Sequence, residues 1–300
     1  MGEDRSGARA EGGVRTLKPP PDRLYGRARG HKLRPRQETL LAVTLPRLAL
    51  HPHQAGDPLA AFGSRPAADP LAAPALQAGA LQAGALQPAP PRPAALQPAA
   101  LQPAALQPAA LQPAPPRPAA LWLEVGFGGG EHALAQAATH PEDGLIACEV
   151  FENGICSLLS RLVPEGGEAD APLPPNLRLW PDDARVLLRL LPDACLDRLF
   201  LLFPDPWPKA RHAKRRFVHP AMLGLVARVL KPGAEWRVAS DDPTYQAWVE
   251  EVMAAQDQFI APPPAVERPA GWPPTRYEAK ALRAGRTPRY WTFRRRGGSN

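Results

Sequence analysis

The stretch FPDPWPKARHAKRR, residues 203 to 216, places a carboxylate among prolines directly before a run of cationic side chains. Each proline fixes its own φ, so the three prolines hold Asp205 in a stiff, extended turn. A carboxylate held in this way is suited to orienting a planar base, and the cations that follow are suited to binding phosphates. The plainer alternative is a strand-ending turn with Trp207 as core cover, followed by a solvated basic segment.

A glycine-rich turn occurs in LEVGFGGGE, residues 123 to 131. The order strand, glycine turn and helix brings the backbone close to a ligand at the carboxyl end of a sheet. Gly126 and Gly128 begin a G-x-G-x-G pattern, but Glu131 stands where the dinucleotide fingerprint needs its last glycine. Glu124 adds a carboxylate within the strand, which would repel a pyrophosphate and tolerate a cationic ligand.

Two further acids follow the next two predicted strands. Glu149 ends the segment LIACEV, where an acidic side chain can accept hydrogen bonds from ribose hydroxyls. Asp183, in DDARVLL, is placed to accept a hydrogen bond from an adenine amino group. Each acid alone is equally compatible with a helix cap or an exposed strand end. Together with Glu124 and the glycine turn, they indicate S-adenosylmethionine, which carries an adenosine, a sulfonium and no phosphate.

Apolar runs alternate with helical patterns throughout the second half of the chain. Strands are predicted at 121–126, 145–150, 177–180, 196–203 and 235–240, and helices near 130–139, 152–163, 183–191, 219–230 and 243–255. This alternation predicts an α/β fold with a mostly parallel sheet covered on both faces. The segments 275–282 and 289–296 are predicted to add an antiparallel edge hairpin around Gly285.

The first part of the chain divides into two segments of different composition. Residues 1–57 form a basic N-terminal arm and an amphipathic segment, and an RNA-tracking arm is as well supported as a solvated tail. Residues 58–119 repeat Leu-Gln and Pro at intervals of five, which predicts an extended, disordered linker. Residues 120–300 are predicted to be the folded domain. A linker of about 60 residues spans on the order of 40 Å, so loose coupling of arm and domain is expected.

The chain is basic overall, with a formal net charge of +7, which favours an anionic partner such as nucleic acid or an acidic membrane surface. No apolar run approaches the roughly 18 residues of a membrane span, and the N-terminus lacks the apolar region of a secretory signal. A cytoplasmic protein without a membrane partner is therefore predicted. Cys148, Cys156 and Cys195 lie in apolar runs without metal-ligand spacing, which predicts reduced core thiols and no metal site.

In several segments the chain resembles the bacterial tRNA (guanine-N7-)-methyltransferase family. The resemblance covers nearly everything outside residues 58–119, and rests on GRARGHKLRPRQ, LEVGFGGGE, LIACEV, FPDPWPKARHAKRR, RVLKPG, ASDD and TRYEAKAL. It implies a class I S-adenosylmethionine-dependent methyltransferase (Rossmann-like) fold with a mostly parallel seven-stranded sheet and an antiparallel edge hairpin. It also implies S-adenosylmethionine as cofactor, tRNA as partner, and transfer of a methyl group to N7 of a guanine in the variable loop.

The resemblance assigns roles residue by residue. The implied cofactor contacts are Glu124, Gly126, Gly128, Glu149, Asp183 and Asp205, and Asp205 is also the implied catalytic residue. The implied substrate and RNA contacts are Lys209, Arg211, His212, Ala213, Lys214, Arg215, Arg216, Asp241, Thr275, Arg276, Tyr277 and Glu278. Arg276 stands where lysine is commoner, which keeps the charge and alters the donor geometry. A monomer or homodimer is expected.

Guanine N7 has an in-plane lone pair and no proton at neutral pH, so its methylation needs no general base. Asp205 is therefore expected to orient the base and to stabilise developing positive charge. Three rival functions remain open: another methyltransferase of this fold acting on a different RNA, a protein or a small molecule; a non-catalytic RNA-binding module; and an NAD(P) oxidoreductase. The basic run beside Asp205 counts against a protein or small-molecule substrate, and a different RNA stays open. The three cofactor acids count against a non-catalytic module, and Glu131 with Glu124 counts against an NAD(P) oxidoreductase.

Overall fold

Within residues 30–63 and 117–297, which the computed structural model describes, seven strands form one mixed sheet in the order β3-β2-β1-β4-β5-β7-β6. Residues 1–29 of the predicted arm and residues 64–116 of the predicted linker lie outside the described part of the chain. The strands are β1 Leu121–Val125, β2 Gly144–Cys148, β3 Leu177–Trp180, β4 Leu196–Leu202, β5 Leu230–Ser240, β6 Phe259–Ile260 and β7 Arg289–Arg295. The first five run parallel, and β7 pairs antiparallel with both β5 and β6. The predicted α/β fold with an antiparallel edge is confirmed.

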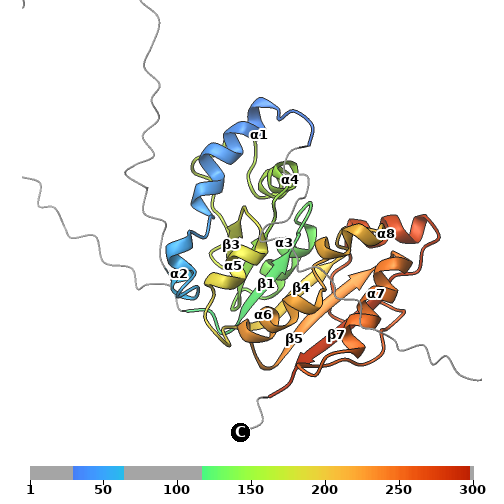
Figure 1. Ribbon diagram of the computed structural model, residues 1–300. Helices are drawn as coiled ribbons and strands as arrows, with labels where there is room; N and C mark the ends of the chain where they lie inside the picture. The colour runs from blue at the N-terminus through green and yellow to red at the C-terminus, as the bar shows by residue number, and fades with distance from the viewer. Residues whose placement is uncertain (1–29, 64–116, 298–300) are drawn as a thin grey trace, which may run out of the picture.

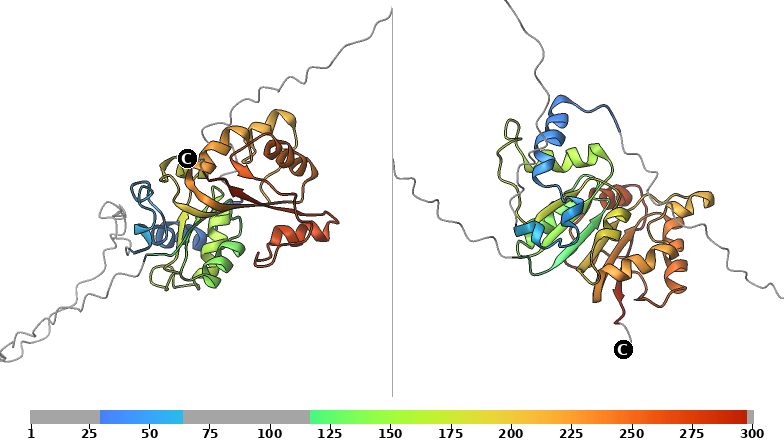
Figure 2. Two further views of the ribbon diagram at one scale, coloured as in Figure 1. Left: turned by 90° about the horizontal axis from the view of Figure 1, so that it is seen from below. Right: turned by 60° about the vertical axis from the view of Figure 1, so that its left-hand side comes forward.

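Helices cover both faces of the sheet (Figures 1 and 2). On one side α3 (Glu131–Thr139) and α4 (Glu152–Leu162) pack against inward residues such as Trp122 and Leu145. The other side is covered by α5 Ala184–Leu190, α6 Pro220–Val229 and α7 Pro243–Ala254. Because β1 to β3 are buried on both faces, their sequences are almost continuously apolar. All five predicted helices are confirmed.

The predicted hairpin of the tail is wrong in its first half. Residues 276–283 form helix α8 (Arg276–Arg283) and not a strand. Thr275 and Glu278 form a capping box in which the Thr275 hydroxyl accepts from the Glu278 N–H at 3.0 Å. This cap starts a helix in the segment that the hairpin prediction assigned to a strand. The antiparallel partners of β7 are instead β5 and the short β6.

The N-terminal segment packs along the β3 edge of the sheet. It comprises α1 Pro35–Thr39, a π-helical stretch η1 Leu40–Thr44, two 3₁₀ turns η2 Leu45–Arg47 and η3 Pro52–Gln54, and α2 Ala60–Gly63. Leu179 of β3 donates to the carbonyl of Leu48 at 2.9 Å, and its own carbonyl accepts from Leu50 at 2.8 Å. Arg178 donates to the carbonyl of Ala61 through both Nε and Nη2, at 3.0 and 2.7 Å. The predicted loose coupling between the N-terminal arm and the folded domain is therefore wrong for the described residues 30–63, which pack on the sheet.

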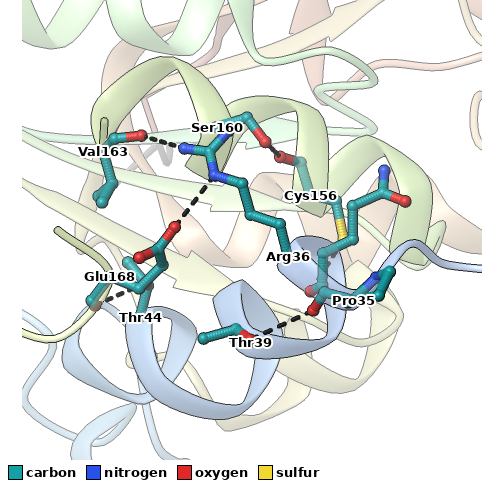
Figure 3. A network of polar contacts seen from close by, with 9 residues as sticks. Pro35, Arg36, Thr39, Thr44, Cys156, Ser160, Val163 and Glu168 are labelled. Carbon is teal, nitrogen blue, oxygen red and sulfur yellow. Dashed lines mark hydrogen bonds and ion pairs between the residues drawn. The ribbon is translucent and has the colours of Figure 1, made fainter. Parts of the chain in front are cut away.

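Arg36 joins this segment to the chain that follows α4 (Figure 3). Its Nε donates to Glu168 Oε1 at 3.0 Å, and its Nη2 donates to the carbonyl of Val163 at 2.6 Å. The Thr44 hydroxyl donates to the carbonyl of Glu168 at 2.8 Å. One arginine on α1 thus connects the end of α4 with the loop beyond it.

The three cysteines occupy the core positions predicted for them. Cys148 and Cys156 are buried, Cys195 is half-buried against the core, and all three are free. Burial raises the pKa of the Cys148 thiol, and raises the pKa of Cys156 and of Cys195 to about 11. All three thiols therefore stay protonated near neutral pH. In the two described ranges, none of the helices has the length and apolar character that crossing a membrane requires.

Replacing Arg36 with alanine should lower the free energy of unfolding by about 2 kcal/mol, because the variant loses a charged hydrogen bond and leaves the Val163 carbonyl without this donor. Urea denaturation followed by circular dichroism measures the change. Arg34→Ala is the matched control, since the Arg34 side chain is exposed. Equal effects of the two substitutions would contradict the anchoring role of Arg36.

The two described ends of the 64–116 segment lie close together. Arg117 Nη2 is 3.3 Å from Asp57 Oδ2, and a methyl group at Gly144 would lie 3.0 Å from both Phe62 and Pro118. A Gly/Ser linker of about eight residues should therefore replace 64–116 and raise the free energy of unfolding by about 1.5 kcal/mol, through the smaller loop-closure entropy. Thermal and urea unfolding of the shortened chain measure this. A loss of cooperative unfolding would show that the segment contributes to the fold.

Candidate functional site

A cavity of about 580 Å³ lies at the carboxyl ends of β1, β2, β3 and β4. Parallel strands bring their carboxyl ends to one edge of the sheet, so side chains from distant parts of the sequence meet there. The predicted site residues that line the cavity are Gly126, Gly128, Glu149, Asp183, Asp205, Arg215 and Tyr277. The structure thus brings together the glycine turn, two of the three cofactor acids and the proline-rich turn.

The glycine turn forms the floor between β1 and α3. Gly126, Gly128 and Gly130 all have positive φ, between 59° and 83°. At Gly128 a Cβ would also lie 2.9 Å from the ring of Tyr277, so the ring would have to shift to admit a side chain. The absence of a side chain at Gly128 lets α8 close over the turn.

Glu149 connects the glycine turn to the end of β2. Its Oε2 accepts from the Gly128 N–H at 2.8 Å, and its Oε1 accepts from the N–H groups of Val150 and Phe151 at 2.8 and 3.0 Å. Burial raises the pKa of Glu149 and the nearby Asp205 adds to the rise, while the three N–H donors oppose it. Each carboxylate oxygen can accept two hydrogen bonds, so Oε2 keeps one acceptor position for a ligand hydroxyl.

Asp183 is the N-cap of α5, one of the roles considered for it from the sequence. Its Oδ1 accepts from the Arg185 N–H at 2.9 Å, and its Oδ2 lies 3.5 Å from Arg185 Nη1. The preceding Asp182 accepts from the Asp183 N–H at 2.7 Å, and both acids line the cavity. Capping therefore fixes the orientation of an acid at the cavity wall.

Glu124 lies behind the cavity wall. It is 3 % exposed, and its Oε2 is 2.9 Å from Nδ1 of the equally buried His132. His132 Nε2 is in turn 3.2 Å from Gln136 Nε2. Glu124 is not one of the described residues that line the cavity. A direct contact between Glu124 and a cofactor stays a prediction, and the structure shows a buried carboxylate–imidazole pair that joins β1 to α3.

Asp205 is exposed at the cavity wall, in the turn that follows β4. Two residues of this turn, Phe203 and Trp207, have positive φ of 52° and 46° although neither is glycine. Such backbone is strained and persists only where surrounding contacts hold it. The Phe203 N–H donates to the carbonyl of Ala239 at 2.8 Å, which fixes the start of the turn.

The cationic residues divide into an outer and an inner set. Lys209, Arg211 and Lys214 are exposed around the 3₁₀ helix η4 (Ala210–Arg215). Arg215 is half-buried with its guanidinium 4.7 Å from the Trp207 ring centroid. Partial desolvation and the surrounding cations lower the pKa of His212, so it is neutral at pH 7.

Two residues of the predicted RNA-binding stretch face the protein interior. Ala213 is 7 % exposed and packs in the core, and Arg216 is 4 % exposed. Arg216 Nε donates to the carbonyl of Pro206 at 3.1 Å, and its Nη2 donates to the carbonyl of Trp207 at 3.0 Å. In this structure neither residue is available to a bound RNA, because both are enclosed by the chain's own packing.

In the late motif Thr275 to Glu278, two members are structural and one lines the cavity. Thr275 and Glu278 cap α8, and Glu278 also accepts from the Tyr290 hydroxyl at 2.7 Å. Tyr277 lines the cavity, while Arg276 Nη2 donates to the Tyr277 hydroxyl at 3.0 Å. Asp241 does not line the cavity and pairs with Arg286 at 2.8 Å.

The sequence did not identify several members of the cavity wall. Phe151, Asp182, Phe203 and Phe217 all line it. Asp182 carries a sequence signal, since it is the acid directly before Asp183 in DDARVLL. The aromatic residues carry no signal beyond an apolar residue near a strand or helix end.

Replacing Glu149 with alanine should speed hydrogen exchange at the Gly128 amide by about tenfold, because one buried acceptor is lost. The amides of Val150 and Phe151 should respond in the same direction. Exchange measured by NMR resolves the three sites, with Glu165→Ala in an exposed loop as control. Unchanged protection at Gly128 would show that another contact holds the turn.

Comparison with known proteins agrees with this arrangement. A family profile described as a putative methyltransferase matches residues 118–289. The chain is 55 % identical to the tRNA (guanine-N(7)-)-methyltransferase of Granulibacter bethesdensis, over 94 % of this chain and 98 % of that protein. It is 43 % identical to the protein of the same name from Rhodospirillum rubrum, over 93 % and 90 %. With matches of this identity and length, the chain belongs to the bacterial tRNA (guanine-N(7)-)-methyltransferase family.

Proposed function

We propose that this protein transfers a methyl group from S-adenosylmethionine to N7 of a guanine in the variable loop of tRNA. One observation carries the proposal: Asp205 is exposed at the wall of an acidic cavity, and the cationic run begins four residues later at Lys209. A polyanion bound by those cations must therefore lie across the mouth of the cavity. The names of the relatives agree with a tRNA substrate.

The charges of the cavity wall fit S-adenosylmethionine. Among the described residues of the wall, the carboxylates are Glu149, Asp182, Asp183 and Asp205, and the guanidinium is that of Arg215. This excess of negative charge opposes a phosphate-bearing cofactor and favours a sulfonium. Oε2 of Glu149 has an acceptor position for a ribose hydroxyl, as described above. When bound, the cofactor supplies an electrophilic methyl group at this wall.

Asp205 orients the base and does not remove a proton. Guanine N7 attacks with a lone pair, so no base is needed for the transfer. The Asp205 carboxylate can accept from the guanine N–H edge, which fixes the base plane, and its charge stabilises the positive charge that develops on the purine. Because the turn is stiff, little conformational entropy is lost when the base is bound.

The exposed cations supply affinity without reading sequence. Lys209, Arg211 and Lys214 point into solvent next to the turn, and contacts of such side chains with phosphates release counterions. Tyr277, which is 40 % exposed at the mouth, offers an aromatic surface for stacking a base. With tRNA as its partner, the protein is proposed to act in the cytoplasm as a monomer or homodimer.

Asp205→Ala should lower kcat for tRNA methylation by about 10²-fold or more while S-adenosylhomocysteine binding changes only a few-fold, because the lost interaction acts on the bound base. Labelled methyl transfer to bulk tRNA, followed by aniline cleavage at N7-methylguanine, measures both rate and target atom. Asp170→Ala, an exposed acid in a loop, is the control. Near-normal turnover of Asp205→Ala would remove its proposed role, and transfer without cleavage would move the target to another atom.

A further inference from the structure

We infer that Arg216 is a positioning residue that holds the turn carrying Asp205, and that it does not contact RNA. The inference deepens the proposed function and rests on it, because the turn matters only if Asp205 acts on a bound base. Arg216 is the last member of a cationic run whose other members lie on or near the surface. Its environment separates it from them.

The guanidinium of Arg216 bridges two successive carbonyls of the turn. Nε donates to the carbonyl of Pro206 at 3.1 Å and Nη2 donates to the carbonyl of Trp207 at 3.0 Å. The planar fork of an arginine presents Nε and Nη2 to two such acceptors at a fixed spacing, whereas all three donors of a lysine ammonium lie on one nitrogen. Pro206 directly follows Asp205, so these bonds act one residue from the proposed catalytic carboxylate.

The buried position of Arg216 excludes a contact between its guanidinium and an RNA phosphate. The side chain belongs to a residue that is 4 % exposed, and its guanidinium carbon lies 4.8 Å from the Trp248 ring centroid. Trp248 is itself fixed, since its indole N–H donates to the carbonyl of Val218. A phosphate could reach Arg216 only if the turn and α7 separated.

The turn needs such a support because its backbone is strained. Phe203 and Trp207, two residues on either side of Asp205, have positive φ without being glycine. The start of the turn is held by the Phe203 hydrogen bond to Ala239, and its end is held by Arg216. Without the guanidinium, Trp207 is expected to relax toward ordinary backbone angles and to move Asp205 away from the base.

A second buried arginine, Arg185, connects the end of η4 to the part of the cavity wall that holds Asp183. Arg185 is 0 % exposed, lies beside Asp183 and donates through Nη2 to the carbonyl of Arg215 at 3.2 Å. The Arg215–Arg216 peptide is therefore connected to the cofactor acid on one side and to the catalytic turn on the other. Arg216 sets the distance from the exposed cations of η4 to Asp205, and so the register in which a bound tRNA presents its guanine.

Arg216→Lys tests the inference, with Lys214→Met as the matched control. Arg216→Lys keeps the charge, so an RNA contact would survive it, whereas the bridge between two carbonyls would not. We expect kcat at saturating tRNA to fall by about 10²-fold, as for a small displacement of a catalytic group, with KM for tRNA and the salt dependence of binding unchanged. Lys214→Met should have the opposite signature, raising KM for tRNA and lowering the salt dependence of binding.

A readout without tRNA separates failure of this inference from failure of the proposed function. In protein labelled with 5-fluorotryptophan, the ¹⁹F resonance of Trp207, assigned through Trp207→Phe, should broaden or shift in Arg216→Lys and stay in place in Lys214→Met. If Arg216→Lys keeps wild-type kcat, or changes only KM and the salt dependence, the positioning role is overturned. If the wild-type protein methylates no tRNA but the Trp207 resonance responds as expected, Arg216 holds the turn and the proposed function fails.

Discussion

The carboxylate of Glu149 is the point at which the ends of two strands and the start of a helix are held together. Its hydrogen bonds from Gly128, Val150 and Phe151 tie the turn after β1 to the chain between β2 and α4. Packing adds to this, because a Cβ at Gly154 would lie 2.5 Å from the Gly128 carbonyl oxygen. A side chain at Gly154 would push these segments apart, and a side chain at Gly128 would displace the ring of Tyr277.

The site separates its charges by sign. Acids surround the cavity, and the exposed cations stand outside it around η4. Were Lys209 or Lys214 to fold inward, they would neutralise the wall that favours a sulfonium, and the surface would lose its attraction for phosphates. The stiff turn between Pro204 and Pro208 keeps the two regions apart at a fixed spacing. Two ligands of opposite charge can therefore be held side by side.

The sequence predicted the sheet and its covering helices because hydrophobic periodicity is a local signal, and the apolar runs of β1 to β4 are flanked by clear helix starts. It did not predict α8, although Thr275 and Glu278 form a capping box, because the segment was expected to pair with 289–296 around Gly285. The docking of residues 30–63 was missed for a different reason. Contacts such as Arg36 with Glu168 join residues 132 positions apart, and chain-length scaling describes a free linker and not one whose ends are anchored.

Arg215 and Arg216 have different surroundings that the sequence of the basic run does not predict. They are adjacent and identical in type, yet the first stacks on Trp207 at the cavity and the second is enclosed beneath the turn. The difference arises because η4 ends at Arg215, so the backbone direction changes between the two residues. A buried guanidinium is costly unless its donors are satisfied, and two strained-turn carbonyls satisfy it here. The same hydrogen bonds that make the burial of Arg216 tolerable thereby make the geometry of Asp205 specific.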